Sequence, residues 1–198
     1  MSIKKLAGQT LWYGVPSIAT RFLGYILNFS LIYLYQAVNI ADITQIYAIF
    51  PFLNILFTYG LETSYFKFLQ QKDKSILYST LSISIFISTI FLTIILLLFQ
   101  KPLVEFTALQ DHPEYITFMA AIVFLDTLTA LPFAKLRQEE RPRKYAFIKM
   151  LGIVVNVSTV IWFLGFCPHI ASSHPESILL LGYNPNIGIA YYLIGNVI

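Results

Sequence analysis

The sequence predicts an all-α integral membrane protein with about five complete transmembrane helices and a truncated sixth. Of its 198 residues, 57% are hydrophobic and only 12% are charged, whereas a soluble domain usually carries about 25% charged residues. The mean hydropathy is +0.70. The apolar residues also fall in runs close to the ~20 residues that a helix needs to cross a ~30 Å hydrocarbon core. The run from Ile76 to Phe99 lacks the alternation that a membrane β-barrel requires.

A single helical bundle over residues 1–198 is expected, with helices at 10–35, 43–69, 76–99, 115–134, 145–166 and 187–198. Proline inside a helix removes a hydrogen bond, so Pro16 predicts a kink near Val15 in the first helix. The second helix contains Pro51 and Gly60. The third is the most uniform apolar run, and its serines and threonines can bond to their own backbone, which favours a peripheral, lipid-facing helix.

The later elements follow the same apolar pattern. The fourth helix is expected to end near Pro132, and a loop rich in Pro, Ser, His and Asn is expected from Pro168 to Asn186. The sixth apolar stretch has only about twelve residues, too few to span a bilayer. This stretch indicates either a fragment or truncated product, or a short sixth helix lying in the membrane interface.

The lysines and arginines predict the orientation. If the N-terminus is cytoplasmic, eleven of them fall in inner segments, only Lys101 falls outside, and Arg21 lies within the first helix. Because inner loops of membrane proteins are enriched in Lys and Arg, the N-terminus is expected in the cytoplasm. The net charge of +3 therefore gives no evidence for a nucleic-acid partner, and none is expected. The basic residues mark the topology and are expected to contact anionic membrane lipids.

Several classes of function are excluded by what the sequence lacks. Its one cysteine, Cys167, excludes an intramolecular disulfide and a cysteine-based metal cluster. Three histidines are expected far apart in loops, so no metal site is predicted: His112, His169 and His174. Motifs for phosphate-binding loops, zinc proteases and serine hydrolases are absent. We expect no cofactor and no enzyme activity.

Three charged residues fall within the expected spans: Arg21, Glu62 and Asp126. A charge at the centre of a membrane helix costs at least ~2.5–3.5 kcal/mol and marks a bundle interior or a water-filled cavity. Arg21 and Asp126 are expected near the midplane, where they form either a pair lining one cavity or a structural salt bridge. Glu62 lies nearer the inner end, where it reaches the interface, pairs with Lys67 or contributes to transport. Asn28 is a further polar cavity candidate.

The joint order of three segments resembles a known family. These are LAGQTLWYGVPSIATRFLGYILNFSLIYLY at 6–35, YGLETSYFKF at 59–68 and LDTLTALPFAKLRQEERPRKYAFIKMLGIVVNV at 125–157. They resemble the first, second, and fourth to fifth helices of oligosaccharide flippases in the multidrug/oligosaccharidyl-lipid/polysaccharide (MOP) exporter superfamily. The resemblance implies a fold of two six-helix lobes around a central cavity, of which this chain is the N-terminal lobe.

The resemblance also implies a function. Such flippases move lipid-linked oligosaccharide, a polyprenyl-pyrophosphate sugar used for polysaccharide or lipopolysaccharide synthesis, across the bacterial cytoplasmic (inner) membrane. Arg21 matches the first-helix arginine that meets the pyrophosphate, and the basic run KLRQEERPRK at 135–144 is a second candidate phosphate contact. Two alternatives stay open: a cation-coupled multidrug exporter that uses Asp126 or Glu62, and an inactive truncated membrane protein.

Overall fold

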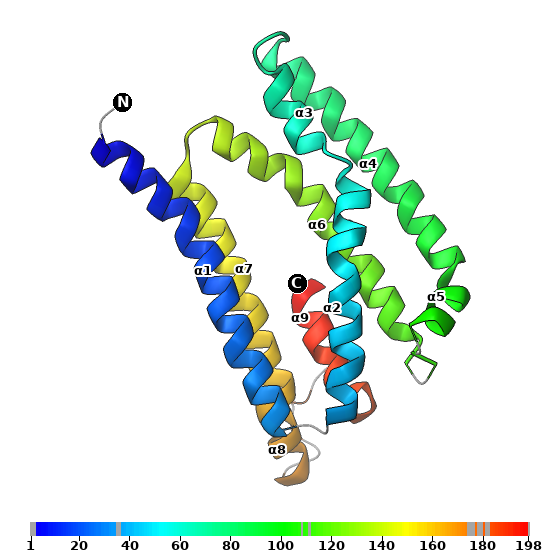
Figure 1. Ribbon diagram of the computed structural model, residues 1–198. Coiled ribbons are helices and arrows are strands. Elements are labelled where there is room, and N and C mark those ends of the chain that lie inside the picture. The colour runs from blue at the N-terminus through cyan, green and yellow to red at the C-terminus, as the bar shows by residue number, and fades with distance from the viewer. Residues whose placement is uncertain are drawn as a thin grey trace. The chain divides into compact units, whose positions relative to one another are not determined.

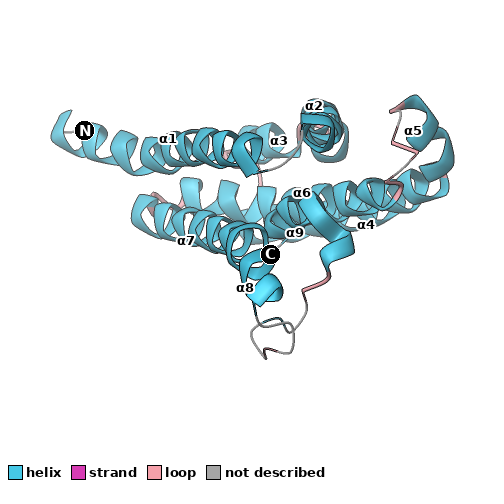
Figure 2. Ribbon diagram, turned by 90° about the horizontal axis from the view of Figure 1, so that it is seen from below, coloured by secondary structure: helices cyan, strands magenta, loops and turns pink. Residues whose placement is uncertain are grey.

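The computed structural model describes residues 3–34, 37–107, 109–110, 112–173, 177, 180 and 183–197. Regular structure in these residues is entirely helical (Figures 1 and 2). Among the described residues, four helical stretches are long and apolar enough to cross a membrane: Ile43–Phe68, Lys74–Leu98, Glu114–Gln138 and Pro142–Ser173. The prediction of a helical membrane protein is confirmed, but these four spans are fewer than the five or six expected.

The chain divides into two compact units, each described here by itself. Residues Thr44–Tyr145 form the central unit, and Met1–Ile43 with Ala146–Ile198 form the terminal unit. In the central unit, α4 (Lys74–Leu98) packs along α6 (Glu114–Gln138), and α3 (Leu61–Phe68) contacts both. The terminal unit contains α1 (Ile3–Leu34) and α7 (Pro142–Val160), the latter shared with the central unit at its first turn.

The expected second helix, 43–69, is interrupted. The structure has α2 at Ala37–Thr58 and α3 at Leu61–Phe68. Between them, Tyr59 and Gly60 both have positive φ angles, 33° and 73°. Glycine adopts this left-handed region readily because it has no Cβ. The prediction of one continuous helix was therefore wrong at Gly60, where the backbone leaves the helical conformation.

The turn into α4 has a side-chain cap. Asp73 precedes α4, and its Oδ1 accepts hydrogen bonds from the backbone N–H groups of Ser75 at 2.8 Å and Ile76 at 3.2 Å. These bonds satisfy donors that have no partner within the helix. A short helix that the sequence did not predict, α5 (Gln100–Phe106), follows α4.

The fourth expected helix does not end near Pro132. α6 continues through Pro132 to Gln138, four residues or about one turn beyond the expected end at 134. The helix ends where Glu140 takes a left-handed φ of 52° and the N–H of Arg141 reaches back to the carbonyl of Leu136 at 3.1 Å. This bond satisfies an otherwise open carbonyl of the last turn. Pro142 then begins α7.

The fifth expected helix is longer than predicted. After α7, residues Ile161–Phe166 form a π-helical segment (η1), and α8 continues from Cys167 to Ser173. The loop expected from Pro168 is therefore helical as far as Ser173. The wider turn explains how Pro168 is accommodated, since the N–H of Cys167 bonds to the carbonyl of Trp162, five residues back.

The sixth apolar stretch is a short, closely packed helix. It begins with a 3₁₀ segment (η3, Pro185–Ala190) and continues as α9 (Tyr191–Val197). At Gly195 an added Cβ would lie 2.9 Å from Cγ2 of Val160 and 3.3 Å from the carbonyl oxygen of Asn156. Glycine thus lets α9 approach the end of α7 closely, as small residues do in membrane bundles.

Candidate functional site

The structure describes only part of the predicted site. Arg21 and Asn28 lie on the described backbone of α1, but their side chains are outside the described residues. Asp126 lies halfway along α6 and is exposed on the central unit. Because Arg21 and Asp126 belong to different units, their pairing stays a prediction.

Glu62 forms an ion pair that the sequence did not suggest. Its Oε1 lies 2.7 Å from Nη2 of Arg137, and the side chains are 40% and 35% exposed. Of the alternatives considered for Glu62, pairing with Lys67 is replaced by pairing with Arg137, because α6 brings its last turn against α3. Sequence spacing gives i,i+3 and i,i+4 neighbours on one helix, and a partner seventy-five residues away is visible only in the packing.

The surroundings of this pair join the same two helices. The hydroxyl of Tyr65 donates to Oε1 of Gln138 at 3.4 Å, and the Arg137 guanidinium lies 6.0 Å from the centre of the Phe66 ring. We name Glu62, Tyr65, Arg137 and Gln138 the α3–α6 clasp. Tyr65 also belongs to a small apolar core, in which it packs with Leu77, Leu131 and Ala134. The clasp therefore holds α3 against the last turn of α6.

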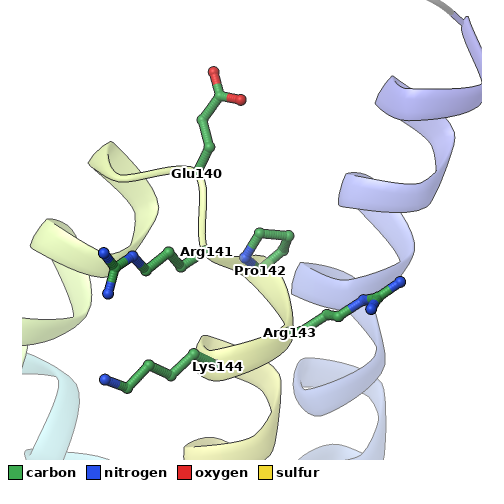
Figure 3. A pocket seen from close by; sticks show the side chains of 5 residues that line it. All are labelled: Glu140, Arg141, Pro142, Arg143 and Lys144. Atoms are coloured by element: carbon green, nitrogen blue, oxygen red, sulfur yellow. The ribbon is translucent and has the colours of Figure 1, made fainter.

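The turn after α6 carries a concentration of positive charge. Glu140, Arg141, Pro142, Arg143 and Lys144 line a shallow pocket of about 400 Å³. Figure 3 shows Arg141 and Lys144 pointing to one side of the turn and Arg143 to the other. Arg141 also pairs with Glu139 at 3.0 Å. The three basic side chains of this turn therefore point to two different sides of it.

A third polar group lies at the break between α2 and α3. The Tyr59 hydroxyl is 3.0 Å from Oγ of Ser84, and Oγ of Ser88 donates to the Tyr59 oxygen at 3.1 Å. We name Tyr59, Ser84 and Ser88 the hydroxyl cluster. It joins the interrupted helix to α4, which sequence reasoning had placed as a peripheral, lipid-facing helix. The hydroxyl-rich composition of α4 was the only available signal.

Groups for metal or redox chemistry do not gather in the described part of the chain. Among those residues, no three side chains of His, Cys, Asp or Glu are close enough to hold a metal ion. Nδ1 of His112 lies 3.0 Å from Glu114, and His169 lies on α8 rather than in the expected loop.

Comparison with known proteins adds no assignment. No protein-family model, curated protein or solved structure matches the chain.

Proposed function

We propose that these residues form the N-terminal lobe of a transporter that flips lipid-linked oligosaccharide across the bacterial cytoplasmic membrane, with the N-terminus in the cytoplasm. The observation that carries the proposal is Arg21, a charged residue at the middle of the 32-residue, largely apolar helix α1. An arginine is retained at such a position only where a cavity, a partner or water compensates for its desolvation.

The chemistry of arginine fits a pyrophosphate headgroup. A guanidinium is charged at every physiological pH and presents a planar fork of donors that matches phosphate oxygens. The polyprenyl tail of the substrate remains in the bilayer, so the protein has to shelter only the headgroup and the sugars. Rocking of one lobe against the other then exposes the headgroup to each side in turn.

The test replaces Arg21 in a strain that depends on this gene for surface polysaccharide. Arg21→Ala is expected to abolish export, and Arg21→Lys to retain only part of it, because lysine keeps the charge but loses the fork. Membrane abundance of each variant controls for folding. Normal export by an Arg21→Ala protein present at wild-type level would remove the proposal's basis.

A second candidate is a cation-coupled multidrug exporter, and Asp126 favours it. This carboxylate lies halfway along α6 and is exposed on its unit, and in such an exporter it would be the group that binds the coupling cation or a cationic drug. Drug resistance conferred by the protein should then be lost in Asp126→Asn. It should survive in Glu62→Gln, because the Glu62 carboxylate is already paired with Arg137.

A further inference from the structure

Each of the four candidate spans begins or ends at one of two short turns. The turn at 69–73 separates the first two spans, and the turn at 139–141 separates the last two. Both turns lie at the same end of the central unit (Figure 1), where Nζ of Lys135 lies 4.4 Å from the centre of the Tyr78 ring. A five-residue turn that has to return reaches at most ~9 Å from its helices, a distance close to the ~5–8 Å depth of one headgroup layer.

Tyrosines mark the level of the membrane interface at this end. About one turn inside three of the span ends lie Tyr65, Tyr78 and Tyr145. Tyrosine is enriched at the boundary between hydrocarbon and water because its ring is apolar and its hydroxyl is polar. Lys135 lies at the corresponding level of α6 and packs its amine over the Tyr78 ring, as long basic side chains do at an interface. This end of the central unit therefore has the residues of a membrane surface.

The residues around the two turns carry an excess of positive charge. Together, 62–78 and 135–145 contain eight basic and four acidic residues. Three of the acidic side chains are engaged within the protein, because Glu62 and Glu139 each pair with an arginine of the same end and Asp73 caps α4. Five basic residues of this end are exposed: Lys67, Lys72, Lys74, Arg143 and Lys144.

The opposite end of the central unit has the reverse balance of charge. Residues 99–114, from the end of α4 to the first residue of α6, contain one basic residue, Lys101, and three acidic ones. The positive charge is therefore confined to one end and does not reflect the composition of the unit as a whole. A leaflet that contains anionic phospholipid has a negative surface potential, which attracts basic residues next to a membrane span.

We propose that the two turns form a docking face for the headgroups of anionic phospholipids. We name Lys72, Lys74, Arg143 and Lys144 the basic face. Lys74 is the first residue of α4 and Lys144 is the third of α7, so both lie within ~3 Å of a span end. Around the second turn, Arg143 points away from Lys144 (Figure 3), an arrangement that suits several headgroups around the bundle rather than one pyrophosphate. This lipid binding is separate from the proposed transport and does not depend on it.

Native mass spectrometry of the whole chain tests the lipid preference. The protein in detergent micelles receives phosphatidylglycerol or phosphatidylcholine with the same acyl chains, and the lipid-bound fraction gives an apparent affinity for each. Phosphatidylglycerol should bind at least about tenfold more tightly, because each basic side chain near an anionic headgroup strengthens binding about fivefold. Equal affinities for the two lipids would overturn the proposal.

Single substitutions locate the binding on the basic face. Lys72→Gln and Lys144→Gln should each weaken phosphatidylglycerol binding about fivefold, whereas Lys144→Arg should keep the affinity because it keeps the charge. Lys101→Gln is the matched control, since it removes one positive charge at the opposite end of the central unit, and it should leave the affinity unchanged. Circular dichroism of each variant controls for folding. An equal loss in Lys101→Gln would show that only net charge matters and would overturn the localised face.

Inorganic pyrophosphate distinguishes a lipid-docking face from a site for a phosphate group. At equal ionic strength, sodium pyrophosphate and sodium chloride should weaken phosphatidylglycerol binding to the same extent, because both act by screening the attraction. Stronger displacement by pyrophosphate would assign the face to phosphate recognition and would overturn the proposal. Normal export by Arg21→Ala would remove the flippase proposal but would leave the outcome of these lipid measurements unchanged.

Discussion

The ion pair between Glu62 and Arg137 should contribute measurably to the stability of the central unit. Its 2.7 Å separation is short, but both side chains are more than a third exposed. Exposed pairs contribute about 0.2–1 kcal/mol because of screening and lost side-chain entropy. The additional contact of Arg137 with Phe66 favours the upper half of that range, so we expect a coupling energy of about 0.5–1 kcal/mol.

A double-mutant cycle measures this coupling. Glu62→Gln, Arg137→Gln and the double variant are unfolded in mixed micelles, and the excess over additivity gives the pair's energy. The coupling corresponds to about a two- to fivefold change in the unfolding equilibrium and should shrink at high salt. A parallel cycle with Lys67→Gln should be additive with Glu62→Gln. Additivity in the Arg137 cycle, or coupling in the Lys67 cycle, would refute the assignment of the pair.

Two substitutions test the interrupted helix and the cap of α4. Gly60→Ala should destabilise the protein by about 1 kcal/mol or more, because a Cβ is unfavourable at a φ of 73°; the helical control Gly152→Ala, with open space around its Cβ, should be neutral or slightly stabilising. Asp73→Ala should cost ~1 kcal/mol by leaving N–H groups of α4 without their acceptor, whereas Asp73→Asn should cost little because asparagine also caps. Thermal unfolding of each variant in detergent gives the comparison, and equal stabilities within either pair would contradict the reasoning.

Much of the helical pattern could be predicted because a bilayer leaves few alternatives. The spans at 76–99 and 115–134 correspond to α4 and α6, since long apolar runs in lipid have to bond their own backbone. The helix ends were harder to predict. Pro132 and Pro168 did not stop their helices, since α6 continues to Gln138 and α8 to Ser173; proline is tolerated within helices of membrane bundles.

The candidate site was predictable only as a set of residue types. Glu62 stood out as a charge inside an apolar run, but its partner Arg137 did not, because the pair depends on how α3 meets the end of α6. The hydroxyl cluster was missed for the same reason. Serines on α4 had an adequate local explanation until Tyr59 was found beside them.

The low charge content and the long apolar runs were together enough to establish a helical membrane chain, since such runs cannot be accommodated in water. The order of its residues likewise predicted which charges lie at membrane depth, because depth follows from position along a span. Folding in three dimensions was needed to show the break at Tyr59–Gly60 and to join Glu62 with Arg137. The ion pair depends on a contact between helices distant in sequence and the break on a local backbone turn, and the hydrophobicity of each helix specifies neither.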